Sequence, residues 1–474
     1  HRVLKYPRGP FPLPFLGNLL ALRNVRDLHS KATEWSQKYG DVFTLWFAHR
    51  PMVILNSYAV IRTALLDLRH DFSGRLPSKI GELQTQGDNS IVFENYNPQW
   101  KALRKVALLA VRKYAVSHSL EKLCTDVVDA YVGSLKEGTQ LVDSRTPSVS
   151  IIFKLIGVSM CGTSVVEEGD EVRRLEAINH QFYKISPNGL PSDIAPWLSA
   201  VYFRREQKMA ALLRDFRSVV YRLFTKAEAS YVPGRADNFS HALLAAREEA
   251  IREQKSDAEY LTKGNMVQVI INLFGAATDT TAGTLHWLFL WLARDPTIQD
   301  KIKKEIDDNI GAAPPVYGDR EKLPFTVACL LETLRLHPAA PLALPHRTSA
   351  DTRVGEKDIP NNTGIMYNIY GVNHDPNLWE KPEEFLPERF LDSATGKVRK
   401  EVGPSISFGI GARTCPGEKL AHMDLFYVLV RLMQRVTFSA PKKPSNVNMS
   451  SIGSSLFLHP APQSIAITKT FPLC

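Results

Sequence analysis

The segment from Asn265 to Ala293 constrains the fold of this chain more than any other feature. It is apolar on nearly every face of a helix, contains no proline, and carries a single acidic residue, Asp279. At about 1.5 Å per residue, such a helix is about 45 Å long, enough to cross a whole domain. A helix that is apolar all round is buried in a large core or in lipid, and an aspartate at its centre is costly in lipid. We therefore expect this helix to run through the centre of a large protein core.

The centre of this segment, from Ala276 to Thr281, is small and polar. An interruption of this kind in a buried helix needs a local reason, such as a site that the helix lines. The ordinary alternative is a threonine whose hydroxyl bonds the carbonyl group four residues earlier, beside an aspartate that is solvated. The residues by themselves leave both interpretations open.

The rest of the chain is predicted to be mainly helical, with small peripheral β-sheets. Helical periodicity of apolar residues marks Arg26–Tyr39, Trp100–Tyr114, Leu120–Leu135, Phe203–Ser230, Pro296–Ile310, Pro324–Leu336 and Gly417–Gln434. β-Branched and aromatic residues predict a hairpin of Val42–Trp46 and Met52–Leu55, and short strands near Ile365–Asn368 and Gln463–Ile467. No repeat and no low-complexity linker divides the sequence, so we expect one large unit over residues 21–474.

Composition limits the class of protein. With 44% hydrophobic and 23% charged residues, the chain is typical of a globular protein rather than a disordered or polytopic membrane protein. The net charge of +9 comes from basic residues spread along the chain without a nucleic-acid motif. This pattern favours acidic protein partners or an anionic membrane surface over nucleic acid. Five scattered cysteines are too few for a disulfide framework and indicate a reducing compartment.

Residues 1–20 are basic and rich in proline. We expect a stiff hinge that follows a membrane anchor missing from this sequence, and a disordered start is the alternative. The sequence contains no run of about 20 apolar residues, which is what a transmembrane helix needs.

A glycine-rich loop near the C-terminus contains Cys415. Glycines precede and follow the cysteine, so the backbone can turn tightly and direct N–H groups at the sulfur. Gly417 is expected to begin a helix whose positive end favours a thiolate. Arg413 can meet an anion such as a carboxylate, and Phe408 can pack against a flat partner. Together these groups suit a haem, whereas the alternatives are an inert buried cysteine, a zinc ligand or a nucleophile.

The chain resembles the cytochrome P450 superfamily in five motifs that occur in the family's order. Phe408 to Gly417 matches the signature F-x-x-G-x-R-x-C-x-G at every fixed position. The other four motifs are Trp100 with Arg104, Ala276 to Thr280, Glu332 to Arg335, and Pro387 to Phe390. The resemblance spans almost the whole chain and implies the mainly helical fold of that family, a large helical haem domain with peripheral sheets.

The resemblance implies that Cys415 binds the iron of haem b (iron protoporphyrin IX). The residues implied to hold the haem propionates are Trp100, Arg104, His346 and Arg413, while Phe408 packs against the macrocycle. A buried network that holds the cysteine loop is implied for Glu332, Arg335 and Arg389. Without the resemblance, the spacing of Glu332 and Arg335 would suggest an ordinary surface pair worth about 0.2–0.5 kcal/mol.

The implied activity is that of a monooxygenase, which inserts one oxygen atom of O2 into a hydrophobic substrate. Asp279 would relay protons, and the Thr280 hydroxyl would position water and oxygen. The chain departs from the family pattern at Ala277, where glycine is usual, and the extra methyl group would narrow the oxygen groove. Two rival functions, a haem-thiolate isomerase that rearranges peroxides and a non-enzymatic haem sensor, fit the Asp279–Thr280 pair less well.

Within the superfamily, the chain looks like the animal microsomal branch that contains the steroid 17α-hydroxylase, steroid 21-hydroxylase and aryl-hydrocarbon families. The supporting stretches are residues 71–75, 193–198 and 279–281. This branch implies the cytosolic face of the endoplasmic reticulum membrane, with the mitochondrial inner membrane as the alternative. It also implies an NADPH-dependent flavoprotein reductase and cytochrome b5 as partners. The implied substrate is a steroid or another planar polycyclic molecule, bound by Asn179 as a polar anchor and by an apolar wall of Ala276, Ala343 and Leu456.

Overall fold

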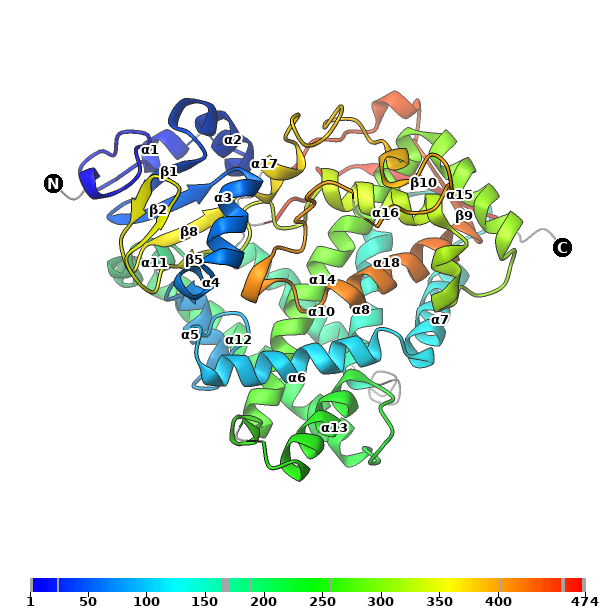
Figure 1. Cartoon of the computed structure of the whole chain (residues 1–474). Helices are drawn as coiled ribbons and strands as arrows, with labels where there is room; N and C mark the ends of the chain where they lie inside the picture. Colours follow the sequence, from blue (N-terminus) through cyan, green and yellow to red (C-terminus); the bar gives the residue numbers. More distant parts are fainter. Residues whose placement is uncertain are drawn as a thin grey trace.

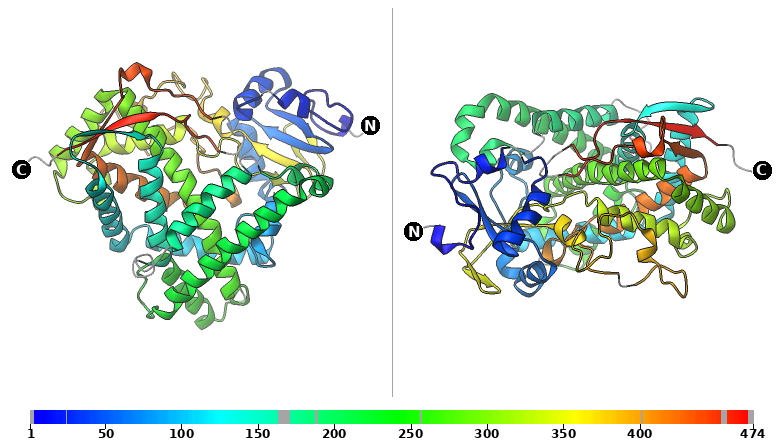
Figure 2. Two further views of the ribbon diagram at one scale, coloured as in Figure 1. Left: turned by 180° about the vertical axis from the view of Figure 1, so that it is seen from behind. Right: turned by 90° about the horizontal axis from the view of Figure 1, so that it is seen from above.

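The computed structural model describes residues 3–23, 25–162, 171–186, 189–255, 257–400, 402–452 and 457–470. Helices make up most of the molecule, and the largest sheet lies at one end of it (Figure 1). The two ends of the chain point to opposite sides of the molecule, as the view from behind also shows (Figure 2). The prediction of a mainly helical protein with small sheets is confirmed.

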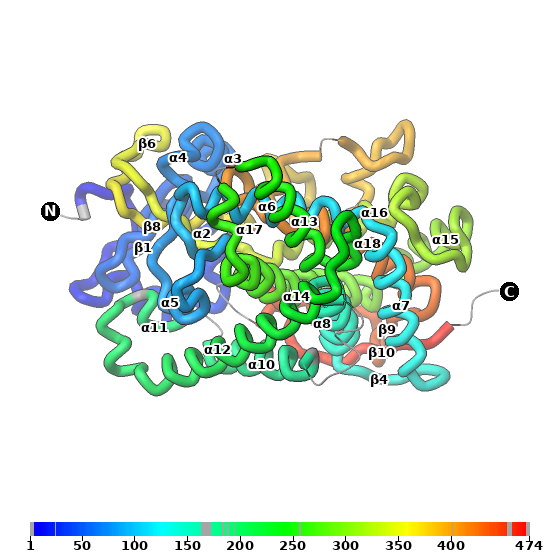
Figure 3. The backbone as a smooth tube through the Cα atoms, turned by 90° about the horizontal axis from the view of Figure 1, so that it is seen from below, coloured from blue at the N-terminus to red at the C-terminus, as the bar shows by residue number. Residues whose placement is uncertain are grey.

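Helix α14 (Lys263–Arg294) is the central element, as the sequence predicts. It begins where the Thr262 side chain accepts a hydrogen bond from the backbone N–H of Asn265, and it ends at Asp295, which is followed by Pro296. Proline is unfavourable in the interior of a helix but favourable at its first position, so Pro296 marks the start of the next helix. Most residues of α14 are buried. The helix therefore lies in a protein core and not in lipid, and Figure 3 shows it from below, surrounded by other helices.

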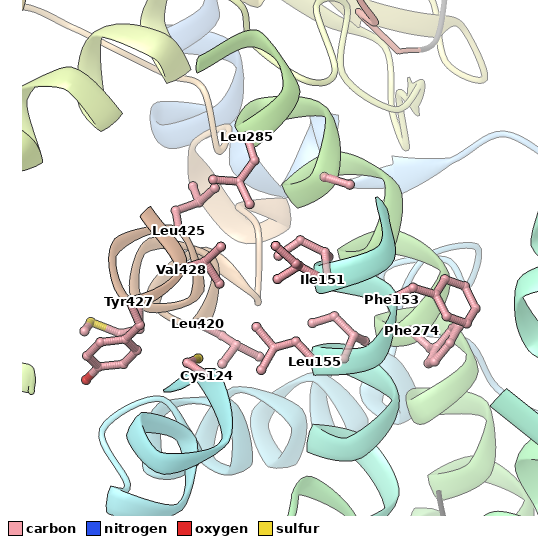
Figure 4. Close-up of a cluster of buried hydrophobic side chains, with 14 of the residues drawn as sticks. Cys124, Ile151, Phe153, Leu155, Phe274, Leu285, Leu420, Leu425, Tyr427 and Val428 are labelled. Carbon is pink, nitrogen blue, oxygen red and sulfur yellow. The ribbon is translucent and has the colours of Figure 1, made fainter. Parts of the chain in front are cut away.

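Four helices cover α14. They are α8 (Thr146–Cys161), α12 (Ser199–Ala229), α16 (Pro324–Leu336) and α18 (Glu418–Met433). A close-up of the core shows Leu285 of α14 and Leu425 and Val428 of α18 pointing toward one another, with Ile151 of α8 beside them (Figure 4). Helix α7 (His118–Ser134) packs against α8 and α18 and contributes Cys124 to this core.

The remaining helices surround this core. They are α1 (Leu19–Leu22), α2 (Leu28–Tyr39), α3 (Tyr58–Arg62), α4 (Arg69–Phe72), α5 (Lys79–Thr85), α6 (Pro98–Tyr114), α10 (Glu171–Ile185), α11 (Pro191–Ile194), α13 (Phe239–Arg252), α15 (Pro296–Asn309) and α17 (Ile369–Asn373). The helices predicted from periodicity are present within a few residues of their expected ends. One predicted helix, Phe203–Ser230, begins earlier, at Ser199, and has non-helical backbone at Tyr202.

The strands of the described residues form three small sheets. The largest joins the predicted hairpin, β1 (Val42–Phe47) and β2 (Arg50–Leu55), to strands β8, β5 and β3, in the order β1-β2-β8-β5-β3. These three strands are β8 (Gly364–Tyr367), β5 (His346–Arg347) and β3 (Gly74–Arg75). Pairing of β3 with β5 sets Arg75 directly opposite His346, which brings together two residues that lie far apart in the sequence.

The second sheet lies at the other end of the molecule (Figure 1). It has the order β4-β10-β9, made of β4 (Thr139–Asp143), β10 (Ser464–Lys469) and β9 (Val436–Ser439). The third sheet is a hairpin of β6 (Thr352–Val354) and β7 (Lys357–Ile359). Because β4 and β10 pair, the residues that follow β4 and those that precede β10 approach the same side of α14. No helix among the described residues is long and apolar enough to cross a membrane.

Replacement of Phe274 tests the packing of the central helix. Phe274 is 3% exposed, and its ring lies 5.3 Å from that of Phe153 and 5.8 Å from that of Phe216, measured between centroids. We expect Phe274→Ala to lower the free energy of unfolding by about 3–5 kcal/mol, measured by urea denaturation. The control Leu109→Ala removes a side chain that is 51% exposed and should cost less than about 0.5 kcal/mol. Equal losses for the two variants would contradict this description of the core.

Candidate functional site

The loop that carries Cys415 turns sharply between a short 3-10 turn, Gly411–Arg413, and the start of α18. The Cys415 N–H donates to the carbonyl oxygen of Phe408 at 2.8 Å, which closes the loop. Gly409 and Gly411 have φ values of +70° and +81°, and a Cβ at position 411 would overlap the carbonyl group of Leu65. Both positions therefore require glycine, because other residues rarely adopt this conformation and a side chain would not fit. The loop presents the cysteine sulfur at the end of a helix, as predicted.

Opposing influences act on the Cys415 thiol. Burial raises the pKa of Cys415 to about 11, while the backbone N–H groups of Gly417 and Glu418 and the guanidinium of Arg104 act to lower it. Burial is the largest of these influences, so the free thiol is protonated at neutral pH. A metal cation bound to a thiol deprotonates it outright, and the N–H groups then stabilise the thiolate. The surroundings of the Cys415 sulfur therefore suit a thiolate that binds a metal ion.

Three arginines gather beside this loop. Arg413 lies over the Trp100 ring, 4.0 Å from its centroid, and Arg104 lies 5.3 Å from the same centroid. Burial, together with the charges of Arg75 and Arg104, lowers the pKa of Arg413 to about 8. Burial also lowers the pKa of Arg75 to about 10. Mutual repulsion of buried cations is unfavourable unless an anion joins them.

The hydrogen bonds of these arginines go to backbone carbonyl groups. Arg413 donates to the oxygens of Ser73 and Glu94 at 3.0 and 2.7 Å, and Arg104 donates to that of Thr414. Arg75 donates to the carbonyl oxygens of Val92, Leu344 and Pro345. Within the described part of the chain, none of the three forms a salt bridge with a carboxylate, and Arg413 Nη1 is buried without a hydrogen-bond partner. The three arginines and the unpaired Nη1 of Arg413 therefore suit a ligand that carries carboxylate groups.

His346 and Phe408 border the same region. His346 is 2% exposed, its Nδ1 lies 2.8 Å from the carbonyl oxygen of Phe72, and burial, with the charges of Arg75 and Arg413, holds its pKa well below the usual range. The half-buried ring of Phe408 lies 5.0 Å from that of His422. Trp100 departs from expectation in one respect. Its indole N–H donates to Ile91 O at 3.0 Å, so Trp100 contacts the arginines through its ring and not through its N–H.

The centre of α14 is open on one side. Ala276 is exposed, and Gly275, Ala277 and Thr280 are half-buried, although the helix is buried on either side of them. The Thr280 hydroxyl donates to Ala276 O at 2.7 Å, which is the local bond that the sequence left open as an alternative. Helix α14 also packs on α18, which begins three residues after Cys415. The exposed stretch of α14 around Ala276 therefore belongs to a helix that contacts the helix of the cysteine loop, and a ligand could contact it there.

Asp279 is not solvated, contrary to the ordinary interpretation of this position. The residue is 4% exposed. Its Oδ1 lies 3.2 Å from Arg145 Nη2, and its Oδ2 lies 2.8 Å from His459 Nε2. An arginine and a histidine beside the buried carboxylate compensate its loss of hydration.

Glu332, Arg335 and Arg389 form a buried charge network. The side chains of Glu332 and Arg335 are both fully buried, and they make two hydrogen bonds, at 2.7 and 2.9 Å. Arg389 Nε donates to Glu332 Oε1 at 3.1 Å. The interpretation of Glu332 and Arg335 as an exposed surface pair, which the residue spacing alone would suggest, is therefore wrong, because neither side chain reaches solvent.

This network is connected to the cysteine loop through Asn373. Arg335 donates to the Asn373 carbonyl at 2.6 Å, and the Asn373 amide donates to Ser407 Oγ at 3.0 Å. Ser407 Oγ in turn donates to Leu334 O at 2.8 Å. Since Ser407 directly precedes Phe408, the charge network fixes the point at which the cysteine loop leaves the core.

The proposed substrate residues are less closely connected. Asn179 is half-buried on α10, between buried Ile178 and exposed His180, and α10 packs mainly on α12 and α8. Ala343 is 8% exposed and adopts a φ of +53° just before β5. Leu456 lies outside the described residues. The structure thus brings the cysteine, arginine and histidine residues together, while a shared pocket for Asn179, Ala276 and Ala343 remains a prediction.

Sequence reasoning missed three residues of this region. Arg75 entered only as part of a resembling stretch, and the pairing of β3 with β5 places it among the arginines. Arg145 and His459, the partners of Asp279, lie 134 and 180 positions away from it in the chain. No local pattern marks them, because their proximity arises from the β4-β10 pairing.

The chain is similar to known proteins over most of its length. Residues 7–467 match the family model described as Cytochrome P450. The chain is 31% identical to the steroid 17-alpha-hydroxylase/17,20 lyase of Gallus gallus, over 92% of this chain and 87% of that protein. It is 31% identical to cytochrome P450 1A2 of Pongo abelii, over 92% and 86%, and 30% identical to cytochrome P450 2M1 of Oncorhynchus mykiss, over 95% and 90%.

Replacement of Glu332 tests the buried charge network. In Glu332→Gln the guanidinium of Arg335 stays buried without its carboxylate, so we expect the free energy of unfolding to fall by about 3–5 kcal/mol. The control is Asp308→Asn, which breaks an exposed pair with Lys304 at 2.6 Å and should cost at most about 0.5 kcal/mol. Comparable losses in urea denaturation would mean that the network does not hold the loop.

Proposed function

The chain belongs to the cytochrome P450 family and is therefore a haem-dependent monooxygenase, and on that premise we propose that Cys415 is its iron ligand and that its substrate is a steroid or another planar polycyclic molecule. The observation that carries the ligand assignment is the arrangement of one half-buried cysteine beside three arginines that form no salt bridge with a carboxylate of the described chain. A haem supplies what both groups lack, an iron for the sulfur and two carboxylates for the arginines.

The proposed cofactor is haem b, held without covalent attachment. Arg104 and Arg413 would bind its propionates, with Arg75 as a third cation, and His346, whose Nδ1 faces the Phe72 carbonyl oxygen, would line the same propionate site. Trp100 supports the two guanidinium groups with its ring face, through cation–π contacts. Phe408 would cover part of the macrocycle. When bound, a haem with a thiolate ligand supplies the activation of O2, because the thiolate donates electron density that favours cleavage of the O–O bond.

The residues of α14 would control the proton that this reaction needs. Thr280 holds a proton on Oγ1, which it now donates to Ala276 O. Rotation about its χ1 would aim the hydroxyl into the opening beside Ala276, where it could orient a water molecule. Asp279, the adjacent residue, would supply protons to that water as an acid. The buried residues of α14 on either side of this opening limit access of bulk water, so side chains such as Asp279 and Thr280 would carry the proton.

Replacement of Thr280 tests this role. Thr280→Ala removes the hydroxyl but leaves the helix intact, so we expect folding to persist while product formed per NADPH falls by about tenfold or more and hydrogen peroxide release rises. The matched control is Thr278→Ala, because Thr278 makes the same bond, to Phe274 O at 3.0 Å, but is buried. Equal product yields in Thr280→Ala and wild type would remove Thr280 from the mechanism.

We propose that electrons come from an NADPH-dependent flavoprotein reductase, with cytochrome b5 as a second partner. The observation in support is a group of exposed basic residues near the cysteine loop, Lys397, Arg399, Lys400 and Lys419. A positive surface at this point attracts an acidic partner to the side of the molecule where the sulfur lies closest to the surface.

Charge reversal tests this docking surface. We expect Lys400→Glu together with Lys419→Glu to slow reduction by the reductase at low ionic strength by about tenfold, because association of charged partners depends on their attraction. The rate should also become less sensitive to salt. The control, Lys38→Glu with Lys357→Glu, changes exposed lysines remote in sequence from the loop. Unchanged stopped-flow reduction rates in the first variant would exclude this surface.

We propose that the enzyme works on the cytosolic face of the endoplasmic reticulum membrane. Large apolar side chains are exposed in two segments: Phe11 and Phe15 near the N-terminus, and Trp197, Val201 and Phe203 in the turn before α12 and in its first residues. Arg204, Arg205 and Lys208 follow directly. Exposed apolar residues flanked by cations are typical of contact with an anionic membrane surface. We infer that residues 1–20 act as the hinge beside that surface.

Replacement of Asn179 tests the proposed substrate class. One of the relatives is named a steroid hydroxylase, and a half-buried amide suits a steroid with one terminal oxygen. If the anchor is real, Asn179→Ala leaves that oxygen unpaired, which costs about 1–3 kcal/mol, or about 5–150-fold in affinity. Spectral titration measures the affinity, and Gln181→Ala, an exposed position on the same helix, is the control. Unchanged steroid affinity in Asn179→Ala would reject this pocket while leaving the enzyme class untouched.

A further inference from the structure

Asp279 is joined to two residues that the chain brings from far away. His459 Nε2 lies 2.8 Å from Oδ2 and Arg145 Nη2 lies 3.2 Å from Oδ1 of the carboxylate. Asp279 itself is 4% exposed, whereas the side chains of His459 and Arg145 are 15% and 51% exposed. The buried acid is therefore connected to the surface through a histidine on one oxygen and an arginine on the other.

The backbone around His459 is fixed by neighbours on two helices. The indole N–H of Trp287, on α14, donates to Leu458 O at 2.9 Å, and the Leu458 N–H donates to Ala339 O, just past α16, at 3.0 Å. The ring of His459 lies against Gly283, one helical turn beyond Asp279. A Cβ at position 283 would lie 3.2 Å from His459 Nδ1, so even an alanine would push the ring. Gly283 thus leaves the space in which His459 reaches Asp279.

Two other histidines lie near the elements that hold His459, and neither changes charge near neutral pH. Burial, with the charges of Arg145 and His459, lowers the pKa of His286 to about 3, and its ring is 2.7 Å from Ser144 Oγ. His337, which stacks on Trp287, is likewise kept neutral because burial holds its pKa well below the usual range. Arginine does not lose its proton in proteins. Histidine is the side chain type that ordinarily changes charge between about pH 5 and 8.

We propose that His459 is a positioning residue that, together with Arg145, holds the carboxylate of Asp279 and returns a proton to Asp279 in each turnover. In this step the imidazolium of His459 loses the proton on Nε2 and becomes neutral, while the carboxylate of Asp279 gains that proton on Oδ2 and becomes a carboxylic acid. The imidazole then takes a replacement proton from solvent. A neutral carboxylic acid no longer attracts Arg145, so the side chain is free to turn toward Thr280 and deliver its proton. This inference rests on the proposed monooxygenase mechanism.

The test uses the holoenzyme with its reductase and His459→Gln, which keeps an N–H donor but cannot exchange a proton near neutral pH. In wild type, product formed per NADPH should change severalfold with pH, because a histidine that passes on a proton must exist in both charge states. In His459→Gln the ratio should be about tenfold lower at pH about 6 and nearly constant with pH. The control His118→Gln, at an exposed position (86%), should keep the wild-type profile. A wild-type slope in His459→Gln overturns the proposal.

A measurement without turnover separates this proposal from the proposed function. The infrared band of protonated Asp279, identified as the band that Asp279→Asn removes, should appear at a higher pH in His459→Gln than in wild type, because the carboxylate loses a cationic neighbour. An unshifted band means that His459 does not act on Asp279. Gly283→Ala, which displaces the ring without deleting it, should give an intermediate shift. If the variants keep the thiolate haem spectrum of wild type but no protein makes product, the monooxygenase assignment fails rather than the role of His459.

Discussion

Arg75, Arg104 and Arg413 are held beside the half-buried Cys415 by backbone carbonyl groups and an indole ring, and no carboxylate of the described chain forms a salt bridge with them. Like charges packed in this way oppose folding unless an anion completes the site. The protein therefore builds most of a binding site for a flat dianion with a metal at its centre, and leaves the negative charge and the metal to the ligand. Ligand binding and stability should be coupled for the same reason.

The rest of the fold supports that site from two sides. On one side, the fully buried pair of Glu332 and Arg335 fixes the start of the cysteine loop through Asn373. On the other side, α14 crosses the core as a rigid, buried helix, and its one opening lies next to Thr280 and Asp279. A change in either support should lower the free energy of unfolding strongly, since one is a desolvated charge network and the other is a close-packed helix. The reacting groups are thereby held on elements that do not move easily.

Much of this could be predicted from the sequence, because the strongest signals are local. The all-apolar segment marked the central helix, and the glycines around Cys415 marked the sharp loop. Helix α8 was missed because its many valines and isoleucines are more typical of strands, and α10 and α13 were missed as well. The neighbours of Asp279 could not be found, because they depend on the pairing of strands that are distant in the sequence. Burial likewise decided between the solvated and the paired interpretation of Asp279, and no pattern of residues encodes burial directly.

The central claim is that the Cys415 sulfur binds the haem iron. The most direct measurement is the absorption spectrum of the ferrous carbonyl complex of the purified holoenzyme, compared with that of Cys415→Ala and of Cys161→Ala, which removes a buried cysteine of α8. The account predicts the strongly red-shifted Soret band of a thiolate-ligated haem in wild type and in Cys161→Ala, and its loss in Cys415→Ala. Persistence of that band in Cys415→Ala would contradict the account, because another residue would then have to be the ligand.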